Sequence, residues 1–151
     1  MVRLRNAMVG LLVTAALSVP YAASGQQQPA APQAGPSMKD APVLCVWKIL
    51  IATQVAAEKC HGGEDAALQA ELASSIKRVD AFIVANDPTA TLDKLAAYKQ
   101  RFRDQAASQD VCSDPDAKAA YADAKRAGAD RIRADTDDLI STPRAPTGDG
   151  C

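Results

Sequence analysis

Residues 43 to 60 read VLCVWKILIATQVAAEKC, and this stretch decides the fold. Between Val43 and Ala52 the only charged residue is Lys48, so the segment is apolar nearly all round. An outer helix of a bundle needs only one apolar stripe. We therefore expect a helix that other helices cover on most sides.

Two alternatives to simple burial remain open for this segment. Part of its surface could bind a partner protein, a second copy of the chain or an apolar ligand. The residues that would form this interaction surface are Val43, Val46, Trp47 and Leu50. A buried strand is also compatible with a short apolar run, but the polar residues and the run of alanines after Ala52 favour a helix.

Turn and capping residues divide the rest of the domain into further helices. The sequence His61-Gly62-Gly63 offers a glycine cap that ends the first helix. Asp87-Pro88 and Asp114-Pro115 each combine an N-cap residue with a proline suited to a first turn. The predicted helices cover residues 42–60, 64–86, 88–108 and 115–140. Gly128 weakens the last of them, and Asp135 falls near its apolar stripe, so the alternative is a break around Ala134 with Asp135 or Thr136 capping a short final turn.

The fold class predicted from this pattern is all-α, a small antiparallel four-helix (or three-plus-one) bundle. Short loops make successive helices antiparallel neighbours, which gives an up-down-up-down order. The predicted domain spans residues 42–140, and residues 141–151 form a C-terminal tail that ends in a cysteine.

The four cysteines can be paired from this topology. Cys45 and Cys60 lie about 22 Å apart if one helix holds both, whereas a disulfide needs Cα atoms within about 7 Å. Cys60 and Cys112 belong at one end of the bundle, and the tail can bring Cys151 back to Cys45 at the other end. We predict the bridges Cys60–Cys112 and Cys45–Cys151. In the alternative, Cys151 stays free or pairs between molecules.

The N-terminus is typical of a secretory signal. Residues 1–25 combine Arg3 and Arg5, an apolar run from Val9 to Val19, and small residues that suit cleavage after Ser24 or Gly25. Residues 26–41 are rich in Pro, Gln and Ala and predict a disordered linker. We expect a periplasmic or secreted protein, in a compartment where disulfides persist, with no membrane span once the signal is removed.

Charge and motifs exclude several classes of function. The chain holds 17 basic and 18 acidic residues, and removal of Arg3 and Arg5 leaves a net charge of −3. Such a domain lacks the excess of basic residues that binding to nucleic acid requires. The lone histidine, His61, fits a helix C-terminus better than a catalytic or metal-binding role, and no C-x-x-C pair is present. We predict no enzyme activity, no metal site and no cofactor.

Two functions stay open after these exclusions. The first is a non-enzymatic, chaperone-like or inhibitor-like interaction module of the cell envelope, which binds an unknown protein partner or itself through the first helix. The second is a carrier of a small apolar ligand bound between the helices, because the many alanines leave room there. No resemblance to a known family decides between them.

Overall fold

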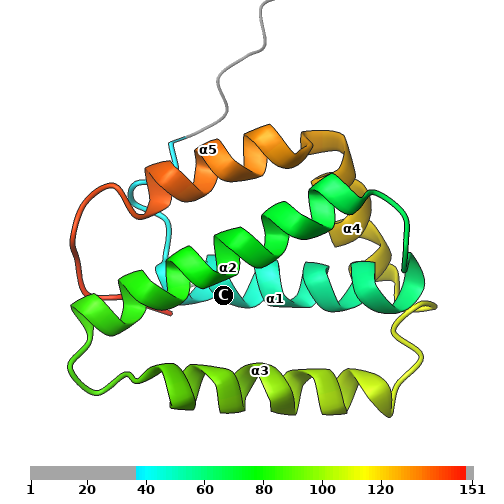
Figure 1. Ribbon diagram of the computed structural model, residues 1–151, viewed down its shortest axis with the longest axis horizontal. Helices are drawn as coiled ribbons and strands as arrows, with labels where there is room; N and C mark the ends of the chain where they lie inside the picture. The colour runs from blue at the N-terminus through cyan, green and yellow to red at the C-terminus, as the bar shows by residue number, and fades with distance from the viewer. Residues whose placement is uncertain (1–36, 149–151) are drawn as a thin grey trace, which may run out of the picture. The chain divides into compact units, whose positions relative to one another are not determined.

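The computed structural model describes residues 37 to 148, which form an all-α unit without strands (Figure 1). Its helices are α1 (Val43–Cys60), α2 (Ala66–Asn86), α3 (Leu92–Ala107), α4 (Pro115–Ala127) and α5 (Ala129–Leu139). The all-helical prediction is therefore confirmed for this part of the chain. The predicted number of helices is not, because five helices replace the expected four.

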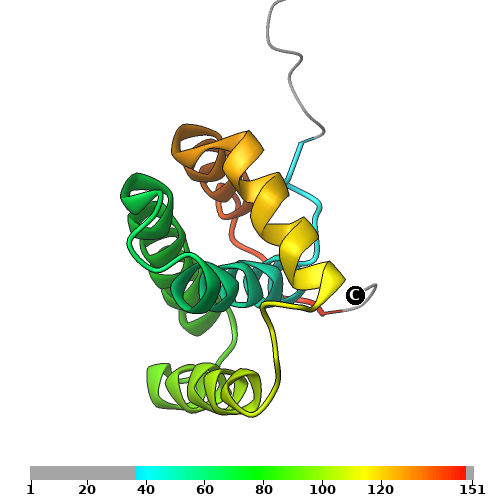
Figure 2. The ribbon, with the colours of Figure 1, turned by 90° about the vertical axis from the view of Figure 1, so that its right-hand side faces the viewer.

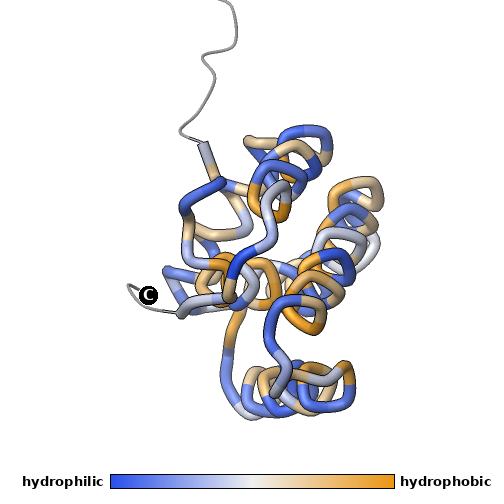
Figure 3. Tube along the Cα trace, turned by 90° about the vertical axis from the view of Figure 1, so that its left-hand side faces the viewer, coloured by the Kyte–Doolittle hydropathy of each residue, from blue (hydrophilic) through white to orange (hydrophobic). Residues whose placement is uncertain are grey.

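Helix α1 lies in the middle of the unit and packs against α2, α3 and α4. Val43, Trp47, Ile51 and Val55 recur every four residues on one face of α1, and each is at most 3% exposed. In Figure 3 the most hydrophobic stretches of the trace lie where α1 and α2 run side by side. Burying this face supplies the main driving force for the fold, at roughly 25 cal/mol per Å² of apolar surface.

Helices α1, α2 and α3 form an antiparallel series, and one buried carboxylate joins all three. The indole N–H of Trp47 in α1 donates to Asp80 in α2, with an N–O distance of 2.7 Å. Lys99 in α3 forms an ion pair with the same carboxylate. The ring of Tyr98, also in α3, packs against Trp47 with a centroid distance of 5.1 Å. Asp80 thus ties α3 to a core in which α3 itself buries only Leu95 and Ala106.

The predicted single helix over residues 115–140 is wrong. It breaks at Gly128, which has φ 79° and ψ 164° and separates α4 from α5. That backbone region is essentially restricted to glycine. The alternative break near Ala134 does not occur, and Thr136 lies inside α5, where its hydroxyl donates to the carbonyl of Ile132 at 2.8 Å.

The break changes the topology as well as the helix count. Helix α4 crosses obliquely from the level of α1 to that of α5, as Figures 1 and 2 show. Helix α5 then runs alongside α2 in the same direction, because its contacts with α2 ascend together along both helices. These contacts are Glu71–Arg133, Ser75–Thr136 and Arg78–Asp137. An up-down-up-down order also makes the fourth helix parallel to the second, so α5 runs in the predicted direction. The departure from the prediction is α4, which crosses obliquely instead of continuing α5 as one helix.

The predicted N-caps have different outcomes. Asp114 caps α4, accepting hydrogen bonds from the backbone N–H groups of Asp116 and Ala117 at 2.8 and 2.9 Å. Asp87 instead closes a turn by accepting from Thr89, and the third helix begins later, with Thr91 as its N-cap. Proline at position 88 is thus part of a turn and not of a helix.

Both ends of the described chain pack on the helices. The backbone N–H of Met38 donates to Asp138 at 2.6 Å and the Ser37 hydroxyl donates to the same carboxylate, so the end of the predicted linker contacts α5. The backbone N–H of Leu44 donates to the carbonyl of Thr147 at 2.9 Å, which brings the tail back to the start of α1. The predicted signal (residues 1–25) and residues 26–36 of the predicted disordered linker lie outside the described residues. Within residues 37–148, every helix is too short or too polar to cross a membrane.

Candidate functional site

The disulfide Cys60–Cys112 is confirmed. It joins the last residue of α1 to the loop between α3 and α4, with the two Cα atoms 5.4 Å apart. The predicted partner of Cys45, Cys151, lies outside the described residues, so that bridge stays a prediction. Two hollows flank the confirmed disulfide, and both use α1 as a wall.

The four residues of the predicted interaction surface of α1 are all buried or half-buried. Val43 and Trp47 are core residues, 1% and 3% exposed, so neither is available to a partner. Val46 and Leu50 are half-buried and pack on the core. The large apolar side chain that α1 does expose is Ile49, at 55%, which the sequence reasoning did not single out. An all-apolar segment gives no signal of which side its neighbours leave uncovered.

Ile49 lies in a hollow between α1, α3 and α4, which we call the α1–α3–α4 groove. Its volume is about 400 Å³. The apolar lining residues are Ile49, Ala52, Phe102, Ala106, Val111, Ala117 and Ala120. Four of these are alanines, whose short side chains keep the helices from filling the space between them.

The rim of the α1–α3–α4 groove is acidic. Asp114 and Asp116 line it together with Gln105 and Gln109, and its lining holds no Lys, Arg or His. The segment from Asp104 to Asp116, which borders the groove, contains four aspartates and no basic residue. The groove therefore combines an apolar floor with a negative edge.

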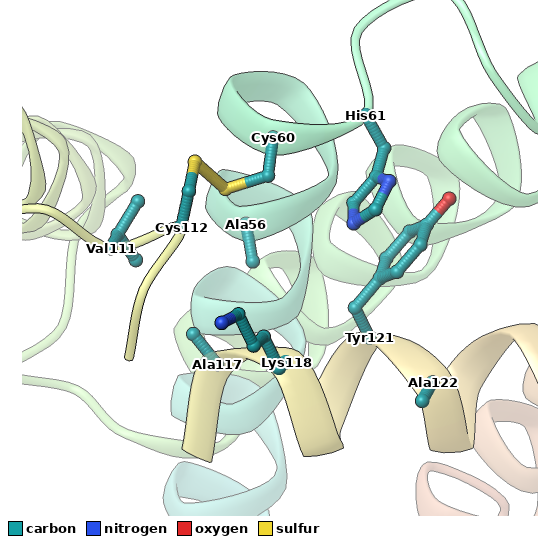
Figure 4. A pocket seen from close by; sticks show the side chains of 9 residues that line it. All are labelled: Ala56, Cys60, His61, Val111, Cys112, Ala117, Lys118, Tyr121 and Ala122. Atoms are coloured by element: carbon teal, nitrogen blue, oxygen red, sulfur yellow. A yellow bond between two sulfur atoms is a disulfide. The ribbon is translucent and has the colours of Figure 1, made fainter. Parts of the chain in front are cut away.

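A second hollow lies between the C-terminal end of α1 and α4, and we call it the disulfide cavity (Figure 4). Its volume is about 410 Å³. The residues that line it are Ala56, Cys60, His61, Val111, Cys112, Ala117, Lys118, Tyr121 and Ala122. The cavity shares Val111 and Ala117 with the α1–α3–α4 groove.

His61 forms one wall of the disulfide cavity, stacked on Tyr121. The two rings are 4.0 Å apart at their centroids and 8° from parallel. The Tyr121 hydroxyl donates to Asp65 at 2.7 Å, and Lys125 pairs with the same carboxylate at 2.8 Å. His61 does sit at the C-cap of α1 as predicted, but the stacking depends on α4 and is not visible in the sequence.

Three acidic residues near the end of α5 each have separate partners. Asp135 pairs with Arg131, Asp137 with Arg78, and Asp138 accepts from Ser37 and Met38. Among residues 37–148, no group of three or more His, Cys, Asp or Glu side chains is arranged to hold a metal ion.

Comparison with protein-family models, with curated proteins and with solved structures finds no match to this chain. The functional argument therefore rests on the two hollows and the side chains that line them.

Proposed function

We propose that this protein is an exported, non-enzymatic interaction module that binds a peptide segment of a partner protein in the α1–α3–α4 groove. The observation that carries the proposal is the exposure of Ile49 at the groove, in a helix whose other large apolar residues are buried or half-buried. Exposed apolar side chains beside a hollow are typical of binding surfaces.

The chemistry of the groove indicates the kind of partner. Apolar side chains of a helix or an extended peptide would fill the space over Ile49 and Phe102. The aspartates at the rim favour basic residues beside those apolar positions, because complementary charge steers association and rejects acidic partners. The partner segment is thus apolar with basic flanks.

Export supports the same function. The signal-like N-terminus and the Cys60–Cys112 bridge both fit an oxidising compartment. A disulfide that pins the α3–α4 loop also holds the groove open before a partner arrives, which lowers the ordering cost of binding.

Site-specific photocross-linking in cells that express the chain tests the proposal. A photoreactive phenylalanine analogue replaces Ile49 in one variant and Leu92 in the other. Leu92 is the matched control, because it is 60% exposed but lies outside the groove lining. We expect a cross-linked partner from position 49 and not from position 92, identified by mass spectrometry as a protein with a basic-flanked apolar segment.

Ile49→Asp should abolish capture of that partner, whereas Leu92→Asp should leave it intact. Equal cross-linking from both positions, or none from position 49, contradicts the proposal. Cross-linked dimers of the chain itself would contradict binding to a partner protein and would show that the groove serves self-association.

A further inference from the structure

The disulfide cavity is built differently from the α1–α3–α4 groove. An inference about the cavity therefore does not depend on the function proposed for the groove. The cavity lies within the 300–1,000 Å³ range of small-molecule pockets. In Figure 4 the disulfide and Ala56 lie on one side, the stacked rings of His61 and Tyr121 lie on the other, and Lys118 lies on α4 at the lower edge.

The aromatic wall of the disulfide cavity is held in place before any ligand binds. Tyr121 is 5% exposed and its hydroxyl donates to Asp65. Burial first, and the hydrogen bond to Asp65 second, raise the pKa of Tyr121 to about 12, so the phenol keeps its proton and its hydrogen bond at neutral pH. On the far side of the stack, the imidazole Nδ1 of His61 lies 3.5 Å from a carboxylate oxygen of Glu64.

The backbone of Asp65 is adapted to this arrangement. Asp65 has φ 48° and ψ 46°, which lie in the left-handed region that residues other than glycine rarely adopt. In that conformation its carboxylate reaches both Tyr121 and Lys125 instead of capping α2. Strained positions of this kind cluster at binding sites, where they hold other groups in place.

The charge at the disulfide cavity is opposite to that of the groove. Lys118 is exposed and lines the cavity, and it has no carboxylate partner in the part of the chain that the structure describes. No aspartate or glutamate is among the lining residues. An incoming anion would therefore meet an unneutralised ammonium group beside an apolar, partly aromatic cavity.

We propose that the disulfide cavity binds a small aromatic carboxylate. The planar ring packs between the His61–Tyr121 wall and the apolar side formed by Ala56 and the disulfide, and the carboxylate accepts a charge-assisted hydrogen bond from Lys118. The carrier function considered from the sequence thus gains a location and a ligand class, and the ligand is an anion with an apolar body.

Two probes with the same ring and different charge test the ligand class. 2-Naphthoate carries the carboxylate, and 2-naphthalenemethanol is its neutral counterpart. Each is titrated into the ¹⁵N-labelled full chain, purified with its disulfide oxidised, and followed by amide chemical shifts. We expect 2-naphthoate to shift residues 56–61 and 117–122 and to bind about tenfold more tightly than the alcohol, which corresponds to about 1.4 kcal/mol.

Lys118→Gln should weaken 2-naphthoate about tenfold and leave 2-naphthalenemethanol unchanged. The control is Arg126→Gln on the same helix, where the arginine is exposed, pairs with Asp123 and does not line the cavity. Ala122→Trp, at an exposed lining position, should block both probes by filling the cavity. Each variant must keep the amide spectrum of the folded chain.

Three results would overturn the inference: shifts confined to other residues, equal affinity for the two probes, or unchanged affinity for 2-naphthoate in Lys118→Gln. Ile49→Asp separates this outcome from the fate of the groove. It should leave 2-naphthoate binding intact, because Ile49 does not line the disulfide cavity.

Discussion

Glu71 is the centre of a polar cluster between α2 and α5. Its side chain is 6% exposed and pairs with Arg133 at 2.8 Å and Arg78 at 3.0 Å. The Ser75 hydroxyl donates to it at 3.1 Å, and the Thr136 hydroxyl oxygen lies 3.0 Å from that of Ser75. A buried carboxylate needs such partners, because an unpaired one costs several kcal/mol to desolvate.

The partners also change the acidity of Glu71. Burial alone would raise the pKa of Glu71, but hydrogen bonds from Arg133 and Ser75 outweigh it and lower the pKa below its ordinary value. A carboxylate with a depressed pKa in the folded state stabilises the fold above the pKa it has when unfolded. That contribution is lost as the pH falls through the folded-state pKa.

We expect Glu71→Gln to lower the free energy of unfolding by about 1–3 kcal/mol at pH 7, because two arginines lose a charged acceptor. The gap between this variant and the wild type should shrink as the pH falls below about 4.3. Urea unfolding at pH 7 and at pH 3 measures both quantities.

Glu58→Gln is the matched control for Glu71→Gln. Its side chain is 43% exposed and lies 3.7 Å from Arg103, so removing the charge should cost less than about 1 kcal/mol. If the loss of unfolding free energy in Glu71→Gln were as large at pH 3 as at pH 7, the charge of Glu71 would not be its cause.

At the scale of the elements, Gly128 decides how α4 and α5 are arranged. A Cβ atom at this position would meet nothing within 4 Å, so space is not the constraint. The constraint is the backbone, because φ 79° with ψ 164° is essentially closed to other residues. The bend lets Tyr121 in α4 contact α1 while Ile132 in α5 contacts α2.

Gly128→Ala should therefore destabilise the protein by about 1–3 kcal/mol, although it improves helix propensity. Urea unfolding gives the free energy. Ala127→Ser, at the neighbouring exposed position, is the control and should change stability by less than about 0.5 kcal/mol. A Gly128→Ala variant that is more stable than the wild type would show that α4 and α5 can join into one helix.

At the scale of the whole molecule, the Cys60–Cys112 bridge supports a weakly packed part of the fold, the region of α3. Helix α3 buries two residues and is joined to α1 and α2 by few contacts, and the bridge anchors the loop that follows it. The bridge closes 52 residues of chain, so it restricts the unfolded state strongly.

The double variant Cys60→Ser/Cys112→Ser should lose about 2–4 kcal/mol of stability. Amide hydrogen exchange should accelerate in α3 and in residues 108–114, while α2 stays protected. Exchange that accelerates equally in α2 and α3 would show that the bridge supports the whole core and not this region.

The second predicted bridge is a further test of the whole molecule. The hydrogen bond from Leu44 to Thr147 brings the tail beside α1, and Gly148 lies next to the Leu44 side chain. Non-reducing peptide mapping of the purified chain should recover Cys45 joined to Cys151 and Cys60 joined to Cys112. A peptide that joins Cys45 to Cys60 would contradict the helical assignment of residues 43–60.

The positions and ends of several helices can be predicted from residues that are neighbours in the chain. Apolar periodicity identifies α2 and α3, glycines after His61 end α1, and Asp114 before Pro115 starts α4. Helix length excludes a Cys45–Cys60 bridge, because a rise of about 1.5 Å per residue separates the two cysteines. The Cys60–Cys112 pairing needs the antiparallel order of the helices as well, which the short loops indicate. These features depend on neighbours in the chain, so the sequence is enough.

The tertiary structure decides which faces meet. The sequence shows that α1 is apolar all round, but only the packing of α2, α3 and α4 leaves Ile49 exposed and buries Trp47. The oblique course of α4 and the stack of His61 on Tyr121 both depend on the bend at Gly128. Those contacts join residues far apart in the chain, so no local pattern could have specified them.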